Sequence, residues 1–227
     1  MASDFDNLDL HTASKLGKVE IVQQLLQAGV DPSARDAFKY TPLHWASQKG
    51  NLDVADVLLK AGAQPDLVDR WRRTPLHRAA KEGHLDIVRL LISAGAEINA
   101  RGDGLWTPLH CSSFHGNVEV VRELLARGAD KAAVDHRGRT PEAVLKMGLF
   151  RAGDTTRDAI QRLLDSAAAA AGGGANTAAA AAVPEGAAAD WNGANGASGG
   201  AAGSPHVPSF GAGSGVSGHG DSFAAGA

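Results

Sequence analysis

The sequence predicts an all-α protein in which short helical hairpins stack into a solenoid, followed by a disordered tail. Three observations support this prediction. A Thr-Pro pair recurs every 33 residues, with the threonines at positions 41, 74, 107 and 140. The first three pairs each precede two short apolar stripes with helical spacing, and each stripe ends near a glycine. Residues 167–227 are rich in alanine and glycine and contain no lysine or arginine.

One unit illustrates the local reasoning. Thr41 is a good N-cap residue and Pro42 suits the first helical position, so a helix is predicted to begin there and to end at Gly50. A second apolar stripe follows and ends at Gly62, where a left-handed residue can close the helix. Each unit is therefore predicted to be a pair of antiparallel helices. Two such short helices leave apolar surface that only neighbouring units can cover.

The segments that follow the threonines carry a recognisable motif. They read TPLHWA at 41–46, TPLHRA at 74–79 and TPLHCS at 107–112. This motif and its period resemble the ankyrin repeat family. The resemblance covers about residues 5–166 and implies a right-handed solenoid that binds other proteins.

The two outer units depart from the motif. Residues 8–13 keep the register and the apolar positions but lack Thr-Pro, as expected of a terminal cap. The last unit has an insertion around 149–153, and its second helix is predicted at about 157–165 with Thr155 as its N-cap. The predicted units are 1–36, 37–69, 70–102, 103–135 and 136–166, and the predicted disordered tail is 167–227.

Charge and composition exclude several classes of protein. The formal net charge of -3 comes from the tail, which holds Glu185, Asp190 and Asp221, so residues 1–166 balance to zero. No broad basic field points to nucleic acid or an acidic membrane surface. The start lacks the pattern of a secretory signal, and no apolar run has the length of a membrane helix. With a single cysteine as well, we expect an intracellular monomer, cytoplasmic and/or nuclear.

The residues that could support chemistry favour structural roles. His11, His44, His77 and His110 fall in separate units, too far apart for metal–nitrogen bonds of about 2.0–2.1 Å to one ion. In ankyrin-like proteins such histidines tie neighbouring units by hydrogen bonds. Cys111, expected to be partly exposed, has no evident base beside it. We therefore predict no enzymatic activity, no metal and no cofactor.

Variable positions point to recognition. The resemblance implies that a finger-like loop before each Thr-Pro and the first helices line a concave surface. Aromatic and basic side chains concentrate there, and such side chains are typical of binding hot spots. The predicted partner-binding residues are Phe38, Tyr40, Trp45, Lys49, Arg70, Trp71, Arg72, Arg78, Lys81, Trp106, Phe114 and His115.

Alternatives stay open for parts of this set. Trp71 and Trp106 could instead lie across neighbouring fingers and extend the core. The basic group around Arg70 to Arg73 and Arg78 favours an acidic or phosphorylated partner segment, but Asp69, Glu82 and Asp86 could neutralise it. Asn99 lies in a segment that resembles the targets of asparaginyl hydroxylases, or it stabilises a turn.

The sequence as a whole predicts a non-catalytic protein–protein interaction module. It would act as an adaptor, a scaffold or a regulatory or inhibitory subunit. Two alternatives are a nuclear cofactor of a DNA- or RNA-binding complex and a targeting subunit of an enzyme.

Overall fold

The computed structural model describes residues 8–148 and 155–170, with side chains as far as residue 166, and is all-helical over these ranges. The described helices form five consecutive pairs, which confirms the predicted all-α repeat fold. The insertion at 149–153 and the predicted tail from residue 171 onward lie outside the described residues. The helices are α1 Leu10–Leu16, α2 Val19–Gln27, α3 Pro42–Lys49, α4 Leu52–Lys60, α5 Pro75–Glu82, α6 Leu85–Ser93, α7 Pro108–His115, α8 Val118–Ala126, α9 Pro141–Leu145 and α10 Thr155–Ala170.

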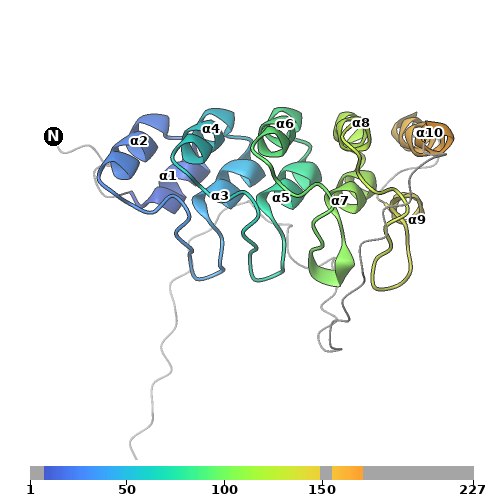
Figure 1. Ribbon diagram of the computed structural model, residues 1–227, viewed down its shortest axis with the longest axis horizontal. Helices are drawn as coiled ribbons and strands as arrows, with labels where there is room; N and C mark the ends of the chain where they lie inside the picture. The colour runs from blue at the N-terminus through green and yellow to red at the C-terminus, as the bar shows by residue number, and fades with distance from the viewer. Residues whose placement is uncertain (1–7, 149–154, 171–227) are drawn as a thin grey trace, which may run out of the picture. The chain divides into compact units, whose positions relative to one another are not determined.

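The helices lie in two rows (Figure 1). The first helices of the units, α1, α3, α5, α7 and α9, pack side by side in one row, and the second helices form the other. The loops that precede α3, α5, α7 and α9 project away from the row of second helices. We name the tips of these loops the first finger (36–40), second finger (69–73), third finger (102–106) and fourth finger (135–139).

Helix boundaries follow from local chemistry. Thr41 caps α3 by accepting the N–H of His44, while Nδ1 of the His44 ring accepts the N–H of Thr41 at 3.1 Å. Removing such a cap typically costs about 1 kcal/mol of stability. Gly50 ends α3 with a φ of 80°, and a Cβ there would lie 2.8 Å from Cε1 of His84. Glycine is therefore favoured at this position, because another residue would strain the backbone and its Cβ would have to displace the His84 ring.

The core lies between the two rows and between neighbouring units. Leu43, Leu58, Leu76 and Leu91 are almost completely buried, in the register that the repeat predicts. The last unit differs in two details from the sequence prediction. Helix α10 already includes Thr155, so Thr155 is part of the helix and not its cap. The helix extends to residue 170, so residues 167–170, which were predicted to belong to the disordered tail, are helical.

The repeated histidines tie the units together, as predicted. Since Nδ1 of His44 accepts a hydrogen bond, Nε2 carries the proton and donates to the carbonyl of Arg73 in the next unit at 2.9 Å. His77 and His110 repeat this pattern, whereas Nε2 of His11 lies 2.9 Å from the carbonyl of Ala34 in its own unit, so the prediction is not confirmed for His11. Burial lowers the pKa of His44 and that of His77 from 6.5 to about 4, so both rings are neutral at pH 7.

Candidate functional site

Each finger is a tight turn, and an aspartate organises three of the four. In the first finger, Oδ1 of Asp36 accepts the backbone N–H groups of Phe38 at 2.8 Å and Tyr40 at 2.9 Å. Asp69 and Asp135 make the equivalent pair of bonds in the second and fourth fingers. The third finger begins with Gly102 and forms a short 3-10 turn, η1, at Asp103–Leu105. The carboxylates therefore point into the turns and leave other side chains outside.

The fingertips use a left-handed backbone conformation at equivalent positions. Lys39, Arg72 and Leu105 have φ values of 59°, 56° and 61°, and the fourth finger has Gly138 with a φ of 69° in this place. A residue other than glycine pays about 1–2 kcal/mol for this conformation. Two basic side chains are thus kept at exposed tips where glycine would fit with less strain.

Backbone hydrogen bonds join the fingers into a row. The N–H of Arg70 donates to the carbonyl of Phe38 at 3.1 Å, and the N–H of Asp103 donates to that of Trp71 at 3.0 Å. The N–H of His136 donates to the carbonyl of Gly104 at 2.9 Å. Each finger is thus fixed to the next through its backbone.

Arg78 lies beneath the first and second fingers and not on their surface. Its Nη2 is 2.5 Å from Oδ2 of Asp69, and both side chains are almost fully buried. The guanidinium carbon lies 4.7 Å from the ring centroid of Tyr40 and 5.5 Å from that of Trp71. Among the described residues, no acceptor reaches Nε of Arg78.

The expectation that Arg78 and Tyr40 are exposed binding residues is therefore wrong. Arg78 is 2% exposed because the finger supplies a carboxylate that neutralises it inside the protein. Tyr40 is 6% exposed because its ring covers this guanidinium and stacks on Trp45, with 4.8 Å between the ring centroids. Both side chains support the surface from below.

Trp106 and Cys111 are also buried, contrary to expectation. Trp106 is 5% exposed and packs edge-on against Phe114, with 5.5 Å between the ring centroids, so it extends the core as the alternative interpretation proposed. Cys111 is 1% exposed, and burial raises the pKa of its thiol to about 11. Its small side chain lies in the register of Arg78, and Gly102 takes the place of Asp69 in that unit.

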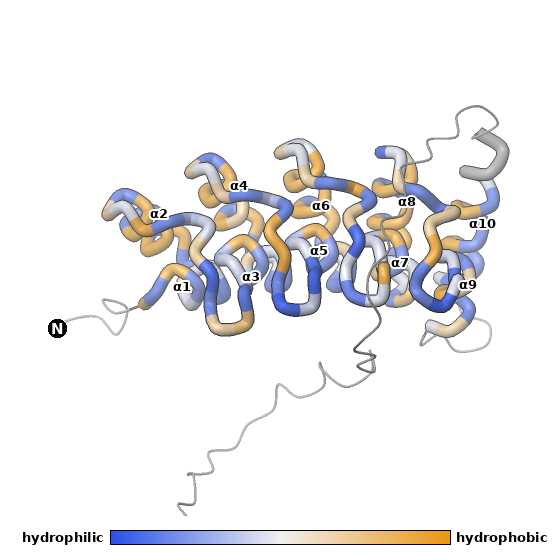
Figure 2. Tube along the Cα trace, turned by 60° about the horizontal axis from the view of Figure 1, so that its bottom comes forward, coloured by the Kyte–Doolittle hydropathy of each residue, from blue (hydrophilic) through white to orange (hydrophobic). Residues whose placement is uncertain are grey.

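The remaining predicted residues are at least partly accessible. Arg70, the most informative of them, is exposed, and its guanidinium carbon lies 4.3 Å from the ring centroid of Phe38 and 4.1 Å from that of Trp71. The second finger, which precedes α5, is hydrophilic (Figure 2). The accessible set is Phe38, Trp45, Lys49, Arg70, Trp71, Arg72, Lys81, Phe114 and His115.

Sequence reasoning missed Lys15 as a member of this surface. Its Nζ lies 4.8 Å from the ring centroid of Trp45 in the next unit. The repeat places Lys15 in the register of Gln48 and Lys81, and this periodicity is the signal that could have identified it. The degenerate motif of the first unit concealed it.

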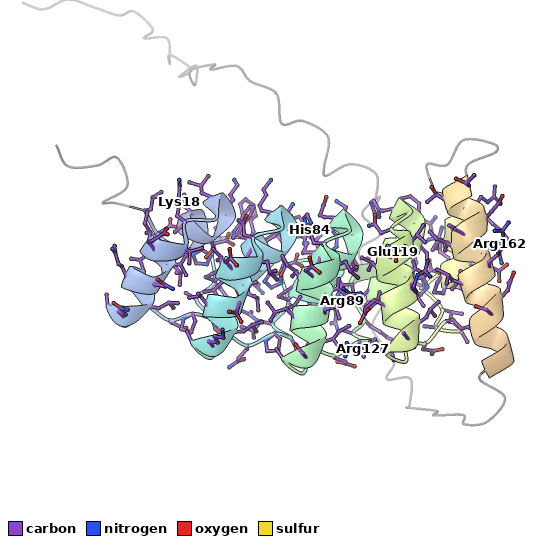
Figure 3. All side chains as sticks on the ribbon, turned by 90° about the horizontal axis from the view of Figure 1, so that it is seen from above. Lys18, His84, Arg89, Glu119, Arg127 and Arg162 are labelled. Atoms are coloured by element: carbon purple, nitrogen blue, oxygen red, sulfur yellow. The ribbon has the colours of Figure 1, made fainter. Side chains whose placement is uncertain are left out.

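Several charges on α6 and α8, in the row of second helices, are paired. Glu123 of α8 accepts hydrogen bonds from Nε of Arg89 on α6 and from Nε of Arg127, each at 3.0 Å. The bond from Arg89 is the main reason that the pKa of Glu123 is lowered. Figure 3 shows Arg89 and Arg127 among the side chains of this face. The charges of these side chains on α6 and α8 compensate one another, in contrast to those of the first two fingers.

Asn99 has a structural role in a loop between units. Its Oδ1 accepts the backbone N–H of Asp130 at 2.8 Å, and Asp66 makes the equivalent bond to Glu97. The Asn99 side chain therefore joins the loops of two units, while its roles in a turn and as a hydroxylation target stay hypotheses. In the described part of the chain, no group of three or more histidine, cysteine or acidic side chains could hold a metal ion.

The stacked pairs, the capped Thr-Pro starts and the linked fingers can be compared with known families. A family model described as "Ankyrin repeats (3 copies)" matches residues 10–102 and 75–135, which is more than half of the chain. The chain belongs to the ankyrin repeat family. Ankyrin repeats are generally protein–protein interaction modules and are typically non-catalytic. No curated protein matched the sequence. Over the described residues, no helix of this ankyrin repeat protein is long and apolar enough to cross a membrane.

Proposed function

We propose that this protein is a non-catalytic intracellular recognition module, monomeric by itself, that binds a partner protein through the first two fingers and the adjoining first helices. The observation that supports this most strongly is the contact of Arg70 with Phe38 and Trp71. It joins aromatic side chains of two fingers under one exposed cation. Exposed arginine and aromatic side chains on a rigid frame are the composition of binding hot spots.

The proposed partner segment is acidic or phosphorylated. The exposed side chains of this surface include the basic residues Lys49, Arg70 and Arg72. The aspartates of the two fingers are occupied by backbone N–H groups and by Trp45 and Arg78. An adaptor, scaffold or regulatory subunit would use such a surface to select its ligand by charge and shape.

Affinity capture with the full chain tests the proposal. Cell extract is passed over the wild type and over the double variant Trp71→Ala/Arg72→Ala, and bound proteins are quantified by mass spectrometry. Because Trp71 is half-buried, a second variant, Arg70→Glu/Arg72→Glu, changes only exposed side chains. We expect both variants to lose the same proteins while their melting temperatures stay close to that of the wild type.

A matched control lies on the opposite face. Arg122→Glu on α8 changes an exposed arginine of that face, and the captured proteins should not change. Equal capture by the wild type and by Arg70→Glu/Arg72→Glu would show that the fingers do not bind the partner. Capture that disappears when nuclease is added would favour the nucleic-acid alternative.

A further inference from the structure

The first two fingers present positive charge without an opposing carboxylate. Lys39, Arg70 and Arg72 are exposed, and their side chains form no hydrogen bond or ion pair with any described residue. The carboxylates of Asp36 and Asp69 are the only acidic groups of the two fingers. Each uses Oδ1 for two backbone N–H groups and Oδ2 for a side chain, so neither reaches the surface cations.

Arg70 is positioned before any ligand arrives. Its guanidinium carbon lies over two aromatic rings, at 4.3 and 4.1 Å, and its backbone N–H is fixed to the neighbouring finger. Contacts of this kind restrict the side chain and lower the entropic cost of binding. The N–H donors of a guanidinium form a planar fork that matches two oxygens of a phosphate or carboxylate.

The positive site is local. The third finger places Asp103 and Leu105 in the register of Arg70 and Arg72, and so interrupts the basic row. Nucleic acid requires a longer basic stripe along its backbone. A site of three cations on two fingers is suited to a single, highly charged group.

We propose that the first two fingers form a binding site for the phosphate monoester of a phosphorylated serine or threonine in a partner segment. This inference rests on the proposed function and specifies the chemistry of its site. A phosphate monoester carries about -1.5 to -2 charges at pH 7 and three strong acceptor oxygens. It therefore matches Lys39, Arg70 and Arg72 better than a glutamate, which brings one charge and two oxygens.

The site can be tested with defined probes and the full-length protein. The probes are an N-acetylated, C-amidated Ala-Ala-Ser-Ala-Ala peptide with phosphorylated serine, the same peptide with serine or glutamate at the centre, and a short oligothymidylate. Binding is followed by NMR, through the indole N–H of Trp71 and the backbone amides of Lys39 and Arg72. We expect saturable shifts with the phosphopeptide, competition by inorganic phosphate and no shifts with the serine peptide. The glutamate peptide should bind at least about ten-fold more weakly than the phosphopeptide.

Variants separate the fork of Arg70 from its charge. Arg70→Lys keeps the charge but loses the planar fork, and should raise the Kd for the phosphopeptide about ten-fold without changing the melting temperature. Arg137→Lys, on the exposed fourth finger, is the matched control and should leave the Kd unchanged. Equal Kd values for the wild type and Arg70→Lys, equal affinity for the glutamate peptide, tighter binding of oligothymidylate, or no saturable shift would each overturn the proposal.

The same experiments distinguish this inference from the proposed function. A protein captured through the fingers that stays bound after phosphatase treatment supports the recognition module and refutes the phosphate site. If the phosphopeptide binds in a way that depends on Arg70 but no protein is captured, the result supports the phosphate site. It refutes the proposal that the fingers bind a partner protein.

Discussion

The buried histidines make the stability of the protein depend on pH between about pH 7 and about pH 4. His44 and His77 have an ordinary pKa of 6.5 and a pKa of about 4 in the folded protein, because burial penalises the charged ring. A lowered histidine pKa means that the unfolded chain binds protons first as the pH falls, so the stability is present above about pH 6.5 and is lost below it. Each pH unit in this window costs about 1.4 kcal/mol per histidine.

Acidification from about pH 7 to about pH 5 should therefore lower the free energy of unfolding by about 2 kcal/mol for each ring, or about 4 kcal/mol for both. Burial also lowers the pKa of His110, which acts in the same direction. Carboxylates with lowered pKa values, such as Asp135, lose their contribution only at more acidic pH, below this window.

Urea unfolding followed by far-UV circular dichroism at several pH values measures this dependence. His77→Gln removes one titrating ring but keeps an amide that can donate and accept, so the loss of stability on acidification should shrink by about 2 kcal/mol. Leu52→Ala changes a partly exposed side chain that does not titrate and should leave the dependence unchanged. A free energy of unfolding that is constant between about pH 7 and about pH 5 would refute the reasoning, as would an equal effect of the two variants.

Three further predictions concern the core, the buried ion pair and a fingertip. Leu58→Ala should lower the free energy of unfolding by about 2–5 kcal/mol in urea unfolding, and Leu52→Ala, at a side chain that is 38% exposed, should cost clearly less. Asp69→Asn should cost about 3–5 kcal/mol because it leaves Arg78 buried without its carboxylate, and adding Arg78→Met should recover stability; no recovery would contradict this. Arg72→Gly should keep or raise the melting temperature, since it relieves the left-handed φ of 56°, yet weaken capture of the partner; a lower melting temperature would disprove the strain.

Features set by short-range chemistry could be predicted from the sequence. Thr41 and Pro42 start a helix and Gly50 ends it, because these residues satisfy or terminate backbone hydrogen bonds within a few positions. The 33-residue register then transfers each assignment to the other units. The start of α10 was placed less well, because the insertion before Thr155 breaks that register.

Exposure on the binding face could not be predicted from one unit alone. Trp45, Arg78 and Cys111 occupy the same position of successive first helices, and a single unit predicts the same partial exposure for all three. The residue nine positions earlier, at the start of the finger, is Asp36 for Trp45 and Asp69 for Arg78. The burial of Arg78 thus depends on the residue at a second variable position. The spacing of nine was present in the sequence, but only the folded finger shows that the two side chains meet.

This pairing also explains how a chain with balanced charge can present a basic surface. Residues 1–166 have as many acidic as basic side chains, and the arginines around position 70 seemed to form one patch. The structure divides them. Inside the protein, Asp69 neutralises Arg78, and the guanidinium of Arg78 lies against the ring of Trp71. At the surface, Arg70 lies over the same Trp71 ring. Removing the Asp69 carboxylate should therefore loosen the position of Trp71 and weaken recognition at Arg70, although the surface charge is unchanged. The buried ion pair is thus expected to contribute to the binding site through geometry and not through its field.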